Sequence, residues 1–193
     1  MFTFQIFTVF LIGLIFGSFA NVCIARLPKD KTIIFGRSNC PKCKKKISWY
    51  DNIPLFSFIL LKGKCRQCNK KISINYFFVE LITGIFFILI YLYTNSYFDF
   101  VLINLILILF LIIFFIDLKY FIIPDILNFS LIFLGLLKNF FPTKNLNFNY
   151  DIEQSIIGGV VGYLTIWIII FLYKKLKNLD AMGLGDAKLM AAI

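Results

Sequence analysis

The residues best suited to chemistry lie near the end of the chain. Residues 180–189 read DAMGLGDAKL, so Asp186 follows a short turn that contains Gly183 and Gly185. The sequence around this motif is apolar, and a carboxylate at the start of a hydrophobic helix is costly unless it has a function. We therefore interpret Asp186 as a catalytic candidate. The two glycines support it because they let the backbone approach a stretched substrate closely.

Two further carboxylates lie in the segment FFIDLKYFIIPD, where Asp117 ends one apolar run and Asp125 lies just inside the next. Carboxylates that are brought close together in a low-dielectric site tend to share one proton, so one becomes a base and the other an acid. Such a pair can activate water against a peptide carbonyl and protonate the leaving amine. We interpret Asp117 and Asp186 as the pair of an intramembrane aspartic protease. Helix caps and interfacial charges remain the alternative for these acids.

Four cysteines form a second candidate site. They occur as two CxxC pairs, CPKC and CRQC, made by Cys40, Cys43, Cys65 and Cys68. Four thiolates in two such pairs satisfy tetrahedral zinc, and the chain between them can return as a short hairpin. Two disulfides or a redox pair are the alternatives, but a reducing cytoplasm and the doubled spacing favour a structural zinc ribbon.

Composition restricts both the fold and the chemistry. The chain has 193 residues, is 60% hydrophobic and carries a net charge of +10. Histidine is absent, which excludes Ser-His and Cys-His pairs and HExxH metal sites. Most basic residues lie between Arg26 and Lys71, so we assign this charge to membrane topology and contact with anionic lipids. No nucleic-acid partner is expected.

The apolar runs predict an all-α polytopic membrane protein with about five full spans plus the start of a sixth, and with a small cytoplasmic four-cysteine zinc-ribbon-like insertion. The positive-inside rule places the polar loop in the cytoplasm and the N-terminus outside. Asp117, Asp125 and Asp186 then share the cytoplasmic face. We expect spans over residues 4–25, 76–93, 100–116, 124–141 and 151–173. We expect three segments: a first transmembrane helix (1–26), a cytoplasmic basic loop (27–75) and a peptidase core (76–193).

Two motifs inside the predicted spans have open interpretations. The small residues of GSFAN, with Gly13 and Gly17, fit either close helix packing or a role at the active site. Glu80 lies about one turn inside the second span. We expect its side chain to extend to the membrane interface, with a functional role as the alternative.

Six motifs in order resemble the type IV prepilin peptidase family. They are GSFANVCIARLP, the CPKC and CRQC pairs, ISWYDNIPLFSFILLKGKC, NYFFVELITG, IDLKYFIIPD and GLGDAKLMAA. The resemblance covers residues 13–193. It implies a bifunctional enzyme of the bacterial inner membrane that serves type IV pilus or type II secretion assembly. Such enzymes cut the basic leader from prepilins or pseudopilins after a glycine, then methylate the new N-terminal residue with S-adenosylmethionine.

By the same resemblance, Asp117 and Asp186 are the catalytic aspartates, and Asp125 holds a supporting motif position. The four cysteines match those of the cytoplasmic domain associated with methyl transfer. Two alternatives remain: a non-catalytic zinc-ribbon membrane assembly factor, and a peptidase that lacks methyl transfer.

The sixth helix begins at the candidate active site and is short. Only seven residues follow Asp186, whereas a span needs roughly 20. We therefore expect a truncated chain, with the first five spans largely intact and protease activity weak or absent.

Overall fold

The computed structural model describes residues 2–33, 36, 38–40, 42–138, 152–177 and 183–193. Throughout these ranges the regular structure is helical, without strands, and the extended chain makes only isolated bridges. The chain divides into two compact units, Met1–Thr94 and Asn95–Ile193. The helical fold class is therefore confirmed.

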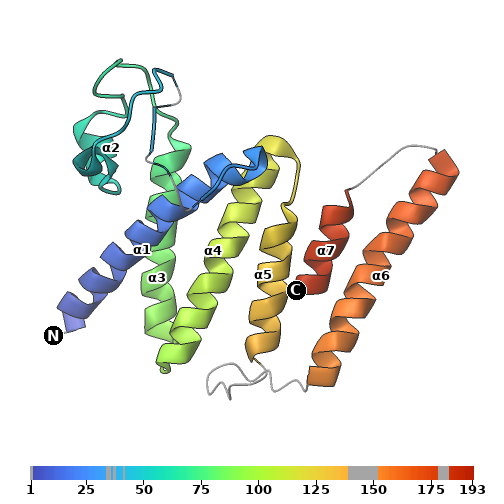
Figure 1. The fold of residues 1–193 in the computed structure, drawn as a ribbon. Helices are drawn as coiled ribbons and strands as arrows, with labels where there is room; N and C mark the ends of the chain where they lie inside the picture. Colours follow the sequence, from blue (N-terminus) through green and yellow to red (C-terminus); the bar gives the residue numbers. More distant parts are fainter. Residues whose placement is uncertain (1, 34–35, 37, 41, 139–151, 178–182) are drawn as a thin grey trace. The chain divides into compact units, whose positions relative to one another are not determined.

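Unit 1 is built on two long helices that pack against each other, α1 (Phe2–Arg26) and α3 (Asn75–Tyr93). The cysteine-bearing loop connects them and contains η1 (Leu27–Lys29), η2 (Trp49–Asn52) and the short helix α2 (Phe56–Leu60) (Figure 1). The predicted hairpin between the two cysteine pairs is wrong, because η2 and α2 occupy this stretch.

Glycines bring α1 and α3 close together. A Cβ added at Gly17 would lie 2.7 Å from the Cα of Glu80, and one added at Gly13 would lie 2.8 Å from the Cα of Gly84. Both distances are shorter than carbon–carbon van der Waals contact. The packing interpretation of these small residues is therefore confirmed, and it fixes Glu80 against α1.

Unit 2 contains α4 (Tyr97–Tyr120), α5 (Asp125–Lys138), α6 (Ile152–Lys177) and α7 (Leu184–Ala192). The short helix α7 packs against both α5 and α6, and α5 packs against α4. The end of α4 and the starts of α5 and α7 lie at the same end of this unit (Figure 1). The unit therefore gathers its candidate acids at one end.

Four of the described helices, α1, α3, α4 and α6, are long and apolar enough to cross a membrane. The fourth predicted span corresponds to α5, whose described part has 14 residues. Its predicted end near residue 141 lies outside the described residues. These apolar helices are typical of an integral membrane protein.

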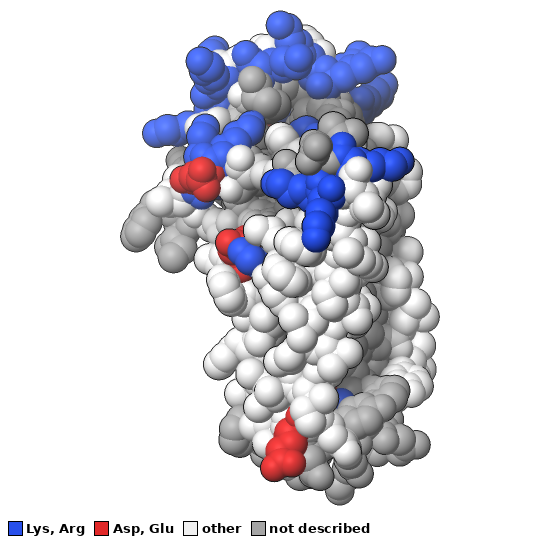
Figure 2. Space-filling view, turned by 90° about the vertical axis from the view of Figure 1, so that its right-hand side faces the viewer, with Lys and Arg blue, Asp and Glu red and all other residues white. Residues whose placement is uncertain are grey.

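Charge is separated along α6. This helix has Glu153 in its first turn and Lys174, Lys175 and Lys177 in its last turn. Figure 2 shows Lys and Arg side chains in blue and Asp and Glu side chains in red on the face that it presents. The basic end of α6 is the end from which the chain continues toward α7.

Candidate active site and metal centre

Asp186 lies in the first turn of α7. Gly183 caps this helix in an extended conformation, and the Asp186 backbone N–H donates a hydrogen bond to the Gly183 carbonyl oxygen at 3.2 Å. The Asp186 side chain is half-buried. An acidic residue at this position interacts favourably with the positive end of the helix dipole, which helps to hold the carboxylate at the start of α7.

Three contacts dock this turn onto the start of α5. A Cβ on Gly185 would lie 3.2 Å from the Cβ of Ile123, so the backbone approaches closely here. The fully buried Asn128 donates a hydrogen bond from Nδ2 to the Gly185 carbonyl oxygen at 3.3 Å. The Lys188 ammonium lies 2.7 Å from Oδ1 of Asp125. The position of Asp186 is therefore set by residues of α5 and of the segment before it.

Asp117 lies in the last turn of α4. This helix continues to Tyr120, so the prediction that the third span stops at residue 116 is wrong by one turn. Phe121 adopts a left-handed conformation and donates its backbone N–H to the Asp117 carbonyl oxygen at 2.9 Å, which ends the helix. Only residues 121–124 separate this turn from α5. The Asp117 side chain is exposed at the surface of the protein.

The structure therefore brings Asp117, Asp125 and Asp186 to one end of unit 2, with α5 packed against both α4 and α7. Asp125 makes an ion pair with Lys188 and is suited to positioning α7. Of the two supporting glycines, only Gly185 is needed for a close approach, because a Cβ on Gly183 would meet ordinary contacts at 3.8 Å or more. Sequence reasoning missed the contributions of Lys188 and Asn128.

The four predicted metal ligands come together in unit 1. The Sγ atoms of Cys40, Cys43, Cys65 and Cys68 all lie within 4.8 Å of one another, and those of Cys40 and Cys68 are 3.9 Å apart. Tetrahedral zinc with sulfur at about 2.3 Å separates its ligands by about 3.8 Å. The backbone N–H of Cys43 is the main cause that lowers the pKa of Cys40 to about 6. The donor set therefore fits a zinc ion.

The two cysteine pairs have the same backbone structure. Lys44 and Asn69, each four residues after the first cysteine of its pair, have positive φ angles of 58° and 54°. In each pair the first cysteine donates its N–H to a lysine carbonyl five residues later, at 3.0 Å. The equivalent bonds join Cys40 to Lys45 and Cys65 to Lys70. We call these two segments, residues 38–47 and 63–72, the first and second knuckles. Their common pattern was visible in SNCPKCKKKI and GKCRQCNKKI but was not recognised.

Glu80 does not extend to the surface of unit 1, so that expectation is wrong. Its residue exposure is 9%, and its Oε2 accepts a hydrogen bond from the Leu55 backbone N–H at 2.8 Å. The close approach of α1 at Gly17 holds the carboxylate inside the unit. A hydropathy pattern could not distinguish these outcomes, because both place an acid one turn inside a helix.

Comparisons with known proteins identify both units. The model of the bacterial peptidase A24 N-terminal domain matches residues 11–94, and that of the type IV leader peptidase family matches residues 104–193. The comparison with solved structures found no significant match.

Three curated relatives share the name prepilin leader peptidase/N-methyltransferase. The protein from Vibrio cholerae is 42% identical, with 95% of this chain and 74% of the relative covered. The protein from Klebsiella pneumoniae is 38% identical, with 95% and 81% covered, and that from Neisseria gonorrhoeae is 36% identical, with 94% and 70% covered. The ranges that the two family models match contain the four cysteines and the three candidate aspartates, and together with these relatives they show that the chain belongs to the type IV leader peptidase family.

Proposed function

We propose that this protein cleaves the leader of prepilins or pseudopilins and then methylates the new N-terminal amine with S-adenosylmethionine. Membership of the family and the names of the relatives support both activities. The observation that carries the peptidase activity is the docking of the GLGD turn of α7 onto Ile123, Asp125 and Asn128, at the end of unit 2 where α4 presents Asp117.

In the proposed cleavage, Asp117 and Asp186 share one proton. The ionised carboxylate takes a proton from water as the water oxygen attacks the carbonyl carbon of the last leader residue. The protonated carboxyl stabilises the developing oxyanion and then gives its proton to the leaving amine as the C–N bond breaks. Asp125 and Lys188 position α7 and take no proton in this scheme.

Cleavage creates the amine that the second reaction uses. The amine nitrogen forms a bond to the methyl carbon of S-adenosylmethionine as the carbon–sulfur bond breaks. The bonding electron pair stays on sulfur, which becomes a neutral thioether, and the amine releases one proton. We propose that the four cysteines hold one zinc ion, which closes the loop of unit 1 and so maintains its shape.

We propose that the protein lies in the bacterial inner membrane with its N-terminus outside. Five full spans and the beginning of a sixth then place the cysteine loop, Asp117 and Asp186 at the cytoplasmic face. The basic residues of the loop and the three lysines that end α6 support this orientation. A prepilin has a basic leader before an apolar helix, and a peptidase at this face would meet the junction between them.

Single Asp117→Asn and Asp186→Asn variants test the peptidase assignment. Each should insert into the membrane and bind zinc as the wild type does, and each should lose cleavage of a coexpressed prepilin. Glu153→Gln is the matched control, because it removes a carboxylate from the opposite end of α6. Undiminished cleavage by either aspartate variant would contradict the role of that residue.

Two outcomes identify the alternative functions. If wild-type protein leaves every prepilin uncut although it inserts and holds zinc, the chain is a non-catalytic assembly factor. If mass spectrometry finds cleaved but unmethylated product in the presence of S-adenosylmethionine, the protein is a peptidase without methyl transfer.

A further inference from the structure

The segment between α4 and α5, residues 121–124, directly follows the helix turn that carries Asp117 (Figure 1). Phe121 adopts a left-handed conformation, which ends α4, and the residues after it up to Pro124 have no regular secondary structure. Proline disfavours the helical conformation in the residue before it, so Pro124 favours an extended Ile123. We call residues 121–124 the α4–α5 connection.

Ile122 has backbone groups that are open to pairing. Before it, the Phe121 N–H donates to the Asp117 carbonyl oxygen, and after it, the Pro124 carbonyl oxygen accepts from the Leu127 N–H. Neither the N–H nor the carbonyl oxygen of Ile122 makes a hydrogen bond within the part of the chain that the structure describes. In an extended chain these two groups of one residue point the same way, and both can pair with a single residue of a neighbouring strand. Ile122 therefore offers one donor and one acceptor to an extended peptide.

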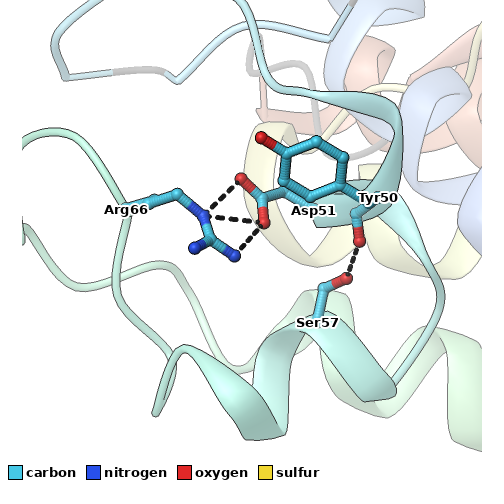
Figure 3. Close-up of polar contacts among 4 residues, drawn as sticks. All are labelled: Tyr50, Asp51, Ser57 and Arg66. Carbon is cyan, nitrogen blue, oxygen red and sulfur yellow. Dashed lines mark hydrogen bonds and ion pairs between the residues drawn. The ribbon is translucent and has the colours of Figure 1, made fainter.

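The cysteine loop of unit 1 shows the contrast. There, Arg66 donates to both oxygens of Asp51, from Nε at 2.9 Å and from a terminal nitrogen at 2.7 Å. Ser57 donates a hydrogen bond to the Tyr50 carbonyl oxygen at 2.7 Å (Figure 3). These polar groups bond to one another within the loop, so they are already occupied. The backbone groups of Ile122 are not.

Helix α7 covers one side of the α4–α5 connection. A Cβ on Gly185 would lie 3.2 Å from the Cβ of Ile123 and 3.5 Å from its carbonyl oxygen. Successive residues of an extended chain direct their side chains and carbonyl groups to opposite sides, so Ile122 faces away from α7. Ile122 is accordingly 46% exposed, whereas Ile123 is half-buried. The edge that carries the open groups is therefore accessible to a peptide.

The proposed substrate needs such an edge. A helix bonds its own N–H and carbonyl groups, so the carbonyl at the cleavage junction is open to attack only where the substrate is unwound. Close to the hydrocarbon core of a membrane, each unwound backbone group without a partner is costly. Ile122 supplies two of the missing bonds at the end of unit 2 where Asp117 and Asp186 are gathered.

We propose that the α4–α5 connection is the docking edge for the substrate, which binds as an extended strand paired with the N–H and carbonyl groups of Ile122. This inference rests on the proposed peptidase function and adds how the enzyme holds the peptide. Recognition through the main chain supplies affinity whatever the side chains of the substrate are. One enzyme then accepts prepilins that differ in sequence around the junction.

The first test removes the donor and keeps the side chain. Ile122 is replaced by its α-hydroxy analogue, which turns the peptide bond before it into an ester without an N–H. The substrate is a synthetic peptide with a basic leader, a glycine before the cleaved bond and an apolar segment after it. Loss of one hydrogen bond should lower kcat/KM about two- to tenfold.

The control is the same replacement at Ile152, the first residue of α6, where an N–H has no partner within the helix. This analogue should cleave as the wild type does. If the full-length wild type leaves the peptide uncut, the proposed peptidase function fails, and this inference fails with it. If the wild type cuts the peptide and the Ile122 and Ile152 analogues cut it equally well, docking at Ile122 is overturned while the peptidase function stands.

The second test measures the conformation of the bound peptide and leaves the α4–α5 connection unchanged. The same peptide, with isotope-labelled carbonyls around the junction, is bound to the detergent-purified Asp186→Asn variant, which should hold it without cutting it. In isotope-edited infrared spectra the labelled carbonyls should absorb at strand frequencies once the peptide is bound. Helical frequencies in the bound peptide would overturn the proposal, whatever the Ile122 analogue does.

Discussion

Replacing Gly17 by alanine should loosen unit 1 by a predictable amount. The added Cβ would lie 2.7 Å from the Cα of Glu80 and 3.1 Å from Oγ1 of Thr83. Carbon atoms pack at about 3.5–4.0 Å, so α1 and α3 have to separate by about 1 Å. Overpacking of this kind costs about 1–3 kcal/mol.

Gly158→Ala is a matched control, because a Cβ at this helical position meets nothing within 4 Å. Both variants gain the same helix propensity, about 1 kcal/mol for glycine to alanine, so their difference isolates the clash. For a chain of this size about 2–4 °C accompanies each kcal/mol, which predicts a difference of about 2–12 °C. The measurement is the temperature at which half of the detergent-purified protein loses its monodisperse form. Equal temperatures for the two variants would refute the close packing of α1 on α3.

Three further predictions concern the metal and the peptidase. Cys40→Ser and Cys65→Ser should each release zinc and expose the loop to limited proteolysis, because structural zinc contributes roughly 10–16 kcal/mol to small domains. Prepilin cleavage should decrease less than methylation in these variants. If metal analysis finds no zinc in the reduced wild-type protein, the metal site is contradicted. In metal-free protein the pKa of Cys40 is lowered from 9.0 to about 6, and that of Cys68 is raised from 9.0 to about 11. Stability from Cys40 should be lost as pH falls from 9 through 6, and stability from Cys68 should be lost as pH rises from 9 through 11. The metal-free loop should therefore resist proteolysis best near pH 9. Gly185→Ala should reduce prepilin cleavage at least about tenfold by displacing α7 from Ile123. Gly183→Ala should leave cleavage nearly unchanged, because a Cβ at this position meets only ordinary contacts. An equal loss of cleavage in both variants would contradict the docking of α7.

Features that depend on local sequence were predicted well. The cluster of four cysteine sulfurs was predictable because each CxxC pair brings its own two sulfurs close together. Only the contact between the two pairs had to be inferred. The position of Asp186 at a helix start followed from the GLGD turn and the apolar residues after it. The glycines of the first span predicted a close contact because small residues at helical spacing leave a groove.

Contacts that depend on how two helices align along each other could not be predicted from the sequence. The bond from Asn128 to Gly185 and the ion pair between Asp125 and Lys188 require α5 and α7 to meet in one register, which apolar periodicity does not specify. The end of α4 was misjudged because hydropathy falls at Asp117, whereas the helix ends only where Phe121 turns left-handed. Glu80 was misplaced because its burial depends on a contact with Leu55, 25 residues away in the sequence.

The matching conformations of the two knuckles conceal an inequality. Each requires a left-handed residue, and the first uses Lys44 where the second uses Asn69. Asparagine adopts this conformation readily, whereas other side chains with a Cβ lose roughly 1–2 kcal/mol in it. The second knuckle is therefore closer to its final form before any ion arrives. We expect zinc to bind the second knuckle first. When a chelator competes, the bonds from zinc to Cys40 and Cys43 should break first, so the metal site has a fixed order of loading and release.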